Sequence, residues 1–334
     1  MEKKILIISN SDELYYYKPV IKVINEIYNH DVYVFDFNQY PRTATMSVSL
    51  SNSRKVCGSL KTTQWSKGQS RKGVMLEIND VFKVWPIRIG NTNISPELDP
   101  VSAFFAKKQA HYAIESLLAL FECEVINPPR IARFVQHNKL YQLEIAKWAG
   151  LSIPDTLVSS NYSDVCEFAE KCGGSMLVKS IYTMPFLNED TKEMFGIYSS
   201  IITKRELTSF SVKACPNIYQ AYIEKKVELR ISYANGKIMT CSIDSQLSEK
   251  TKIDWRNYDF GNVKHTTYKL PKDIQRTLVK YMTRIGLKYG QIDMILTPND
   301  EYVFLEVNPS GQWGWIQGLT GLEIDHSIAK MLIE

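Results

Sequence analysis

The order of apolar and polar positions near the start of the chain predicts a βαβ unit. Residues 3–10 (KKILIISN) hold a continuous apolar run between polar residues, which is typical of a strand buried on both faces. Residues 13–28 repeat apolar positions at helical spacing, and residues 32–37 (VYVFDF) form the second strand. We therefore expect a Rossmann-like N-terminal domain. Because this stretch carries no GxGxxG motif, it does not indicate nucleotide binding by that domain.

The pattern then divides the chain into three parts. Short β-like runs fill residues 45–90, a long helical pattern covers residues 99–121, and Pro128 and Pro129 end the next strand. Residues 131–149 read as helical, with Asn138 as a possible cap inside the helix. We expect an N-terminal domain over residues 1–124, a central subdomain over 125–204 and a C-terminal subdomain over 205–334.

The second half of the chain alternates strands and helices. Its clearest turn is Asn235-Gly236, which separates two alternating runs and is typical of a two-residue hairpin. A helix over residues 273–287 and a final hairpin complete the pattern. These elements predict an α/β (α+β) protein whose second sheet is mixed and mostly antiparallel.

The final hairpin carries polar side chains at unusual places. Residues 291–296 (QIDMIL) and 302–307 (YVFLEV) are apolar runs, each interrupted by one acid, Asp293 and Glu306. Asn308 lies two positions after Glu306, so both would point to the same face of the strand. Carboxylate and amide oxygens suit a hard cation such as Mg²⁺, so these three residues are candidate metal ligands. The alternative is a solvated strand face followed by an ordinary turn.

Two lysines are candidates for binding phosphate. Lys139 begins a helical pattern, and Lys179 ends the apolar strand MLVKS. A lysine at the end of a buried strand can lay its stem in the core and hold its ammonium at a cleft. Either side chain could instead be an ordinary surface charge.

The segment over residues 219–230 (YQAYIEKKVELR) combines a strand end with charges. Its backbone from residue 220 to 223 could pair with the edge of an adenine, and Glu224 or Glu228 could accept hydrogen bonds from ribose hydroxyls. Arg230 could reach a phosphate with two parallel hydrogen bonds. Further on, Arg256 lies next to Trp255 in a loop and could steady an oxyanion or a substrate carboxylate. The alternatives are a strand with a solvated charged face and a tryptophan that anchors a loop.

Composition narrows the class of protein. The chain has 334 residues, 44% hydrophobic and 23% charged, with a net charge of +4, which permits an anionic substrate but lacks the basic footprint of a nucleic-acid-binding protein. Six scattered cysteines lack zinc-ligand spacing, and the first apolar run is too short for a spanning helix. We expect a cytoplasmic protein without a membrane or nucleic-acid partner. The sequence also lacks the P-loop, HExxH and GxSxG motifs.

Taken in order along the chain, these segments resemble an ATP-grasp ligase. The set comprises Lys139, Lys179 in MLVKS, QAYIEKKVELR, DWR, QIDMIL and FLEVNPSGQW. More narrowly, it resembles the microviridin-type graspetide macrocyclases, which close ω-ester or ω-amide rings in ribosomally made precursor peptides. The similarity covers essentially the whole chain and is strongest from residue 125 to 325. EVNPSGQW preceded by DWR is fairly specific to that group, whereas the lysine pair and the metal set are shared by ATP-grasp enzymes generally.

The resemblance implies a role for each candidate residue. Lys139 and Lys179 would hold the phosphates of ATP, and Gln220, Ala221, Tyr222 and Ile223 would form the adenine hinge. Glu228 would lie near the ribose and Arg230 near the phosphates. Asp293, Glu306 and Asn308 would hold one or two Mg²⁺ ions. Arg256 would face the acyl-phosphate or the substrate carboxylate.

It also implies a substrate and a partner. The hairpin over residues 181–203 and the helix over 204–213 would grip the leader of a precursor peptide whose core is rich in Thr/Ser and Asp/Glu. Family similarity suggests a homodimer. One departure concerns WPIR, where the group often shows an aromatic residue and two arginines and this chain keeps only Arg88. A substrate role for that strand is therefore not assigned.

Several functions remain open at this level. The expected reaction is ATP-dependent closure of ω-esters between Asp/Glu side chains and Thr/Ser hydroxyls. The alternatives are an ω-amide-forming macrocyclase that uses Lys, a ligase that adds a free amino acid to a carboxyl group, and a non-catalytic nucleotide-binding scaffold. The segment GQWGW at residues 311–315 would either shape a turn or line the pocket for the peptide carboxylate.

Overall fold

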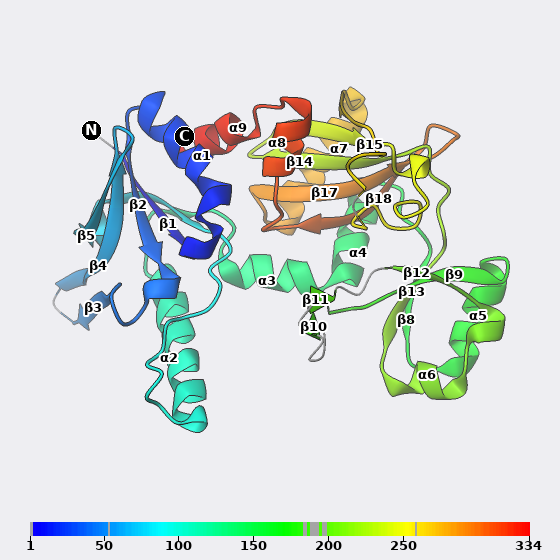
Figure 1. Cartoon of the computed structure of the whole chain (residues 1–334), viewed down its shortest axis with the longest axis horizontal. Coiled ribbons are helices and arrows are strands. Elements are labelled where there is room, and N and C mark those ends of the chain that lie inside the picture. Colours follow the sequence, from blue (N-terminus) through cyan, green and yellow to red (C-terminus); the bar gives the residue numbers. More distant parts are fainter. Residues whose placement is uncertain (1–2, 53, 183–185, 188–193, 196–198, 258) are drawn as a thin grey trace.

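The computed structural model describes residues 3–52, 54–182, 186–187, 194–195, 199–257 and 259–334. Figure 1 shows the N-terminal sheet on one side of the molecule and two further sheets on the other, with helix α3 (Pro129–His137) between them. The candidate residues lie on the two sheets of the second half, at the start of helix α4 (Lys139–Ala149) and in the segments that connect these elements.

The N-terminal sheet has a parallel centre and an antiparallel flank. Strands β1 (Lys4–Ser9), β2 (Asp31–Asp36), β6 (Val81–Pro86) and β7 (Glu124–Val125) pair in parallel. Strands β3 (Met46–Ser51), β4 (Arg54–Ser66) and β5 (Gln69–Glu77) pair in antiparallel fashion, and β4 joins them to β2. The strand order is β3-β4-β2-β1-β6-β7, with β5 on β4. The continuous apolar runs of β1 and β2 are buried on both faces, as their sequence pattern predicts.

Helices cover both faces of this sheet. Helix α1 (Leu14–Glu26) follows β1, and it packs against the last helix of the chain, α9 (Ile324–Ile333). Helix α2 (Pro100–Leu118) packs its second half on the other face through Ile114 and Leu117. Asp99 caps α2 by accepting hydrogen bonds from two backbone N–H groups, and Pro100 occupies the first turn.

The central sheet has the strand order β12-β9-β13-β8 and is antiparallel throughout. Its strands are β8 (Thr156–Ser159), β9 (Ser175–Lys179), β12 (Ser200–Thr203) and β13 (Asn217–Gln220), and helices α5 (Tyr162–Lys171) and α6 (Ser209–Ala214) pack beside it. The expected boundary after residue 204 falls between β12 and β13.

Part of the segment expected to grip the leader lies outside the described residues. Residues 183–185, 188–193 and 196–198 belong to that part. The described remainder includes β10 (Phe186–Leu187) and β11 (Met194–Phe195), which pair in antiparallel fashion.

The C-terminal sheet has the order β16-β15-β14-β17-β18, and each pair is antiparallel. Its strands are β14 (Val227–Ala234), β15 (Lys237–Ile243), β16 (His265–Tyr268), β17 (Tyr289–Leu296) and β18 (Tyr302–Asn308). Asn235 and Gly236 join β14 to β15 with φ values of 43° and 89°, the positive values that a two-residue hairpin turn requires. Helices α4 (Lys139–Ala149) and α7 (Lys272–Ile285) cover one face.

Two details differ from the helical pattern of the sequence. The stretch expected as one helix is two helices, α3 and α4, because Asn138 leaves the helical region with φ −119° and ψ 71°. Lys139 thereby becomes the first residue of α4. The chain also contains short 3₁₀ helices at Ser11–Glu13, Phe37–Gln39, Ile78–Asp80, Lys204–Glu206 and Ser245–Leu247.

The end of the chain joins the two halves of the molecule. After β18 comes α8 (Gly314–Thr320), and α9 then returns to the N-terminal sheet, beside α1 in Figure 1. Trp85 of β6, Tyr289 of β17 and Trp313 pack in one buried cluster with ring centroids 5.7 to 6.1 Å apart. Within the described residues, no helix combines the length and the apolar composition needed to cross a membrane.

Candidate active site

A pocket opens between the central sheet and the C-terminal sheet. Its walls come from β9 and β13 on one side and from β14, β17 and β18 on the other, with the start of α4 and the loop after β15 closing it. Of the predicted site residues, the following line it: Lys139, Lys179, Gln220, Ala221, Ile223, Glu228, Arg256, Asp293 and Glu306. The tertiary structure therefore brings together candidates from positions 139 to 306.

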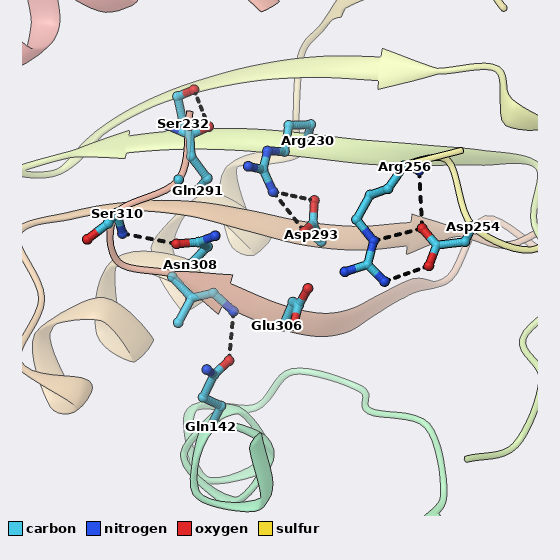
Figure 2. A network of polar contacts seen from close by, with 12 residues as sticks. Gln142, Arg230, Ser232, Asp254, Arg256, Gln291, Asp293, Glu306, Asn308 and Ser310 are labelled. Atoms are coloured by element: carbon cyan, nitrogen blue, oxygen red, sulfur yellow. Dashed lines mark hydrogen bonds and ion pairs between the residues drawn. The ribbon is translucent and has the colours of Figure 1, made fainter. Parts of the chain in front are cut away.

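The two predicted carboxylates are direct neighbours. Asp293 of β17 pairs with Glu306 of β18 across the ladder, and a bulge follows Asp293, so that Met294 pairs with Phe304. Figure 2 shows both side chains on the same side of the two strands. The turn between them is residues 297–300, in which the Asp300 N–H donates to the Thr297 carbonyl. The expected hairpin thus forms, and it places two carboxylates side by side.

Each carboxylate already has a cationic partner. Arg230 on the adjacent strand β14 donates from Nη1 to both oxygens of Asp293, at 2.8 and 3.0 Å. Lys139 forms an ion pair with Glu306. The Arg230 side chain is buried, and its Nε is a buried donor without a hydrogen-bond partner among the described residues. Arg230 stands behind Asp293 rather than in the pocket lining.

Asn308 is the last residue of β18, two positions after Glu306. It pairs with Gln291 across the ladder, and its Oδ1 accepts a hydrogen bond from the Ser310 N–H at 3.0 Å. Asn308 is not part of the pocket lining. Its amide oxygen still has a second lone pair, which a cation could use.

The donor set fits a magnesium ion. No cluster of three or more His, Cys, Asp or Glu side chains suited to a metal occurs in the part of the chain that the structure describes. The site instead offers two adjacent carboxylates with an amide oxygen nearby, which is a partial ligand set made only of oxygens. Proteins commonly bind Mg²⁺ with such a set, and phosphate oxygens supply further ligands. A divalent cation there would take the place of Lys139 beside Glu306, while Arg230 stays paired with Asp293.

Lys179 is set up to receive an anion. It ends β9, and its Nζ donates to Gln220 Oε1 at 2.6 Å, so its partner is a neutral amide. Gln220 in turn donates to the Thr156 hydroxyl at 2.9 Å. Burial lowers the pKa of Lys179 to about 8, and the nearby positive charges of Lys139 and Arg256 act in the same direction. A partly buried ammonium among like charges binds a phosphate group favourably.

Lys139 is similarly perturbed. Burial lowers its pKa to about 8, with a further contribution from Arg256 and an opposing one from Asp293 and Asp254. Its position as the first residue of α4 directs it toward β18. Gln142, one turn later, fixes that helix to the strand by accepting a hydrogen bond from the Val307 N–H at 2.7 Å, as Figure 2 shows.

The linker after β13 contains most of the residues predicted as an adenine hinge. The Ala221 N–H donates to the Asp155 carbonyl, and Ala221 and Ile223 line the pocket. Tyr222 has 37% of its surface exposed and is not part of the lining. The linker joins the central sheet to the C-terminal sheet.

Lys225 is a pocket residue that the sequence analysis did not single out. It forms an ion pair with Glu228 at 3.0 Å and donates to the Ile253 carbonyl at 2.8 Å. Burial raises the pKa of Glu228 above its ordinary value, although the charge of Lys225 opposes the shift. The available signal in the sequence was a lysine three residues before an acid. Because Lys226 follows Lys225 directly, the sequence did not show which lysine pairs with Glu228.

Asp254 is the second residue that the sequence analysis left without a role. Its carboxylate accepts from Arg256 Nε at 2.8 Å, Arg256 Nη2 at 2.5 Å and the Arg256 N–H at 3.1 Å. Burial would raise the pKa of Asp254, but the hydrogen bonds and charge of Arg256 outweigh it and lower the pKa to about 2. The Ser199 N–H also donates to Asp254, which connects the loop to the central subdomain. Asp254 thus fixes the Arg256 guanidinium at the pocket.

The GQWGW segment is structural in most of its contacts. The Gly311 carbonyl accepts from the Tyr289 hydroxyl at 2.6 Å, and Trp313 packs into the buried cluster and donates to Asp325 at 2.5 Å. Trp315 packs against Trp255, with ring centroids 5.3 Å apart. Trp255 in turn lies 5.5 Å from the Arg230 guanidinium. The segment therefore supports the residues behind the carboxylates and does not line the pocket.

The charges of the pocket define what it can do. Lys139, Lys179, Lys225 and Arg256 face an equal number of acids, namely Glu228, Asp254, Asp293 and Glu306. Such a site can bind a polyphosphate at its lysines and a divalent cation at its carboxylates. It can also stabilise negative charge that develops on a reacting group near Arg256.

Comparison with known proteins bears on this geometry. Residues 136–332 match the model of the RimK-like ATP-grasp domain. No curated protein sequence matches the chain. The structure of a RiPP-associated ATP-grasp ligase from Chryseobacterium gregarium, in complex with ADP and a leader and core peptide, is similar with a TM-score of 0.87 and 26% identity. The alignment covers 99% of this chain and 96% of that one.

Two further structures come from Microcystis aeruginosa MRC. The macrocyclase MdnC, bound with precursor peptide MdnA, is 26% identical and has a TM-score of 0.81. The macrocyclase MdnB is 26% identical and has a TM-score of 0.77. In both cases 99% of each chain is covered. The expected ATP-grasp fold, with its Rossmann-like N-terminal domain, is confirmed. The family match spans more than half of the residues of this chain, which therefore belongs to the RimK-like ATP-grasp family and is an ATP-grasp ligase.

Proposed function

We propose that this ligase closes ω-ester rings in a ribosomally made precursor peptide, between Asp or Glu side chains and Thr or Ser hydroxyls. The proposal rests above all on the match over nearly the whole chain to a ligase solved with ADP, a leader and a core peptide. The similarity includes the N-terminal domain, which lies outside the RimK-like match.

The reaction needs an activated carboxyl group. A carboxylate is a poor acceptor for an alcohol, so its oxygen first attacks the γ-phosphorus of ATP, ADP leaves, and an acyl-phosphate forms. The hydroxyl oxygen of a Thr or Ser in the same peptide then attacks the acyl carbon. The carbon–oxygen bond to phosphate breaks, phosphate leaves, and the hydroxyl proton is lost to solvent or a base.

The residues of the pocket suit these steps. We assign Lys139 and Lys179 to the phosphates, the linker from Gln220 to Ile223 to adenine, and Glu228 to ribose. Arg256, fixed by Asp254, would stabilise the acyl-phosphate or orient the peptide carboxylate. Arg230 would keep Asp293 in place behind the phosphates. Asp293, Glu306 and Asn308 would hold Mg²⁺, which when bound supplies charge neutralisation at the phosphate oxygens.

The enzyme would hold the precursor peptide through its leader. We propose that the segment from residue 181 to 203 and the helical segment from 204 to 213 bind it, which raises the local concentration of the tethered core into roughly the mM range. We further propose that the protein is cytoplasmic. We also propose that it forms a homodimer, and sedimentation analysis tests this oligomeric state.

Mass spectrometry of a matched precursor tests the reaction. Ring closure removes the mass of one water per ring and yields one ADP for each. Partial hydrolysis at mild alkaline pH would distinguish esters from the amides that a Lys nucleophile gives. An increase by the mass of an amino acid would replace the proposal with the addition of a free amino acid, and the absence of ADP would favour a non-catalytic scaffold.

A further inference from the structure

The linker between the two sheets of the pocket contains two consecutive lysines with opposite environments. Lys225 has 4% of its side chain exposed, and it contacts Glu228 and the Ile253 carbonyl. Lys226 has 53% exposed and pairs on the surface with Asp300. The first lysine therefore belongs to the pocket, and the second belongs to the solvated face.

The contacts of Lys225 connect three separate segments. The lysine belongs to the linker, Glu228 stands near the start of β14, and Ile253 lies in the loop after β15. The residue after Ile253 is Asp254, which fixes Arg256. A displacement of the Lys225 ammonium would consequently affect both the acid at one end of the pocket and the loop that carries the arginine.

Stability alone is a weak reason for this buried pair. Burying a lysine and a glutamate removes both charges from water, and apolar residues of similar size often stabilise a fold as well or better. Burial already raises the pKa of Glu228, and the loss of Lys225 would raise it further. A protonated carboxyl group is a poorer acceptor for hydroxyl donors, so the pair keeps Glu228 in its accepting form.

We infer that Lys225 is a positioning residue, which orients the Glu228 carboxylate toward the ribose hydroxyls of the nucleotide and holds the 253–256 loop in register with it. This inference rests on the proposed nucleotide site. It assigns Lys225 to recognition of the ribose and leaves phosphate binding to Lys139 and Lys179. The protein should therefore bind nucleotides without ribose hydroxyls more weakly than ADP, and this difference in affinity should depend on Lys225.

Calorimetric titration with ADP and with 2′,3′-dideoxy-ADP, without any peptide, tests the inference. We expect the intact chain to bind ADP about tenfold more tightly than the dideoxy nucleotide, the size of a hydrogen bond to a charged acceptor. In Lys225→Met, ADP affinity should fall about tenfold and the discrimination should shrink to less than about twofold. Lys225→Arg should recover part of both. Lys226→Met is the matched control and should change neither.

The double variant Lys225→Met/Glu228→Gln removes the buried unpaired carboxylate and guards against misfolding of the single variant. It should melt close to the intact chain and still lack discrimination. Retained discrimination in Lys225→Met, or an equal loss in Lys226→Met, overturns the inference while leaving the nucleotide site intact. If the intact chain does not bind ADP, the proposed function and the inference fall together.

Discussion

Asp293 of β17 lies directly opposite Glu306 of β18, and each carboxylate contacts a different cation, Arg230 and Lys139 respectively. The four charges come from β14, β17, β18 and the first residue of α4. Two acids at adjacent ladder positions would repel each other, and the two cations offset that repulsion. If a divalent metal ion replaces the lysine, the site gains one positive charge, which the phosphates of a nucleotide would balance.

The first prediction concerns the carboxylate pair. Glu306→Gln should lower ATP consumption by about 100-fold or more, because the metal loses a charged ligand where phosphate charge is stabilised. Coupled measurement of ADP release with a matched precursor checks this. Asp300→Asn, on the turn of the same hairpin and 71% exposed, is the control and should keep full turnover. Unchanged turnover in Glu306→Gln would remove Glu306 from the metal site.

The second prediction is a pH dependence of nucleotide binding. The pKa of Lys179 is about 8, and phosphate binds its protonated form. ADP affinity should therefore be constant below pH 8 and fall by up to about tenfold per pH unit above it, until the raised pKa of the complex is reached. Lys179→Arg keeps its charge and should make the profile shallower, and the remaining slope should come from Lys139, whose pKa is also about 8. An equally steep profile in that variant would assign the titration to another group.

The lowered pKa of Lys179 also affects the stability of the free protein. Stability should change with pH in the opposite direction to ADP affinity. The unfolded lysine has its ordinary pKa of 10.5, above the folded value, so the unfolded chain binds more protons between these two pH values. The stability of the free protein should therefore rise as pH increases from about 8 to about 10.5. Bound ADP should abolish this rise, because it raises the pKa of Lys179. Denaturant midpoints of the intact chain and Lys179→Met, with and without ADP, check this sign.

The third prediction concerns Gly311. A Cβ at this position would lie 2.6 Å from Gln291 Cγ, closer than packed atoms allow, and 3.0 Å from Arg230 Nη2, which is a tight contact. Gly311→Ala should cost about 1 to 3 kcal/mol of stability and disturb Arg230. Gly314→Ala, three residues later, meets no atom within 4 Å and should be neutral or slightly stabilising. Denaturant unfolding of both variants distinguishes a packing effect from a general sensitivity of the segment.

The fourth prediction separates nucleotide binding from chemistry at Arg256. Its guanidinium meets Asp254 through two parallel hydrogen bonds, a geometry that lysine does not reproduce. Arg256→Lys should lower ring formation by about 100-fold while ADP affinity changes little. Arg88→Lys breaks a similar two-bond pair with Glu13 away from the pocket and serves as control. Equal losses in both variants would point to a structural effect.

The fifth prediction addresses the leader. Phe210 of α6 is 85% exposed and lies in the helical segment proposed to bind the leader. Phe210→Ala should weaken leader binding about tenfold, as for loss of an aromatic anchor, without changing ADP affinity. Phe104→Ala, at an exposed phenylalanine of α2, is the matched control. Equal leader affinity in titrations of the two variants would exclude α6 from the leader site.

Local patterns in the sequence identified the elements and six of the eight charged residues that line the pocket. The apolar runs of β1, β2, β17 and β18 predicted strands because short apolar runs between polar residues are typical of buried strands. Asp293 and Glu306 stood out because each interrupts such a run, and the turn between them set their pairing. Their proximity was thus predictable within one hairpin.

Only the tertiary structure decided which charges meet. Lys139 reaches Glu306 from far along the chain, Ser199 holds Asp254, and Lys225 connects Glu228 to Ile253. The sequence could not give these pairings, because the direction of a side chain toward a distant partner depends on how α4, the linker and the loop pack on the C-terminal sheet. For the same physical reason, GQWGW proved to be a support: the burial of Trp313 against Trp85 requires both halves of the molecule.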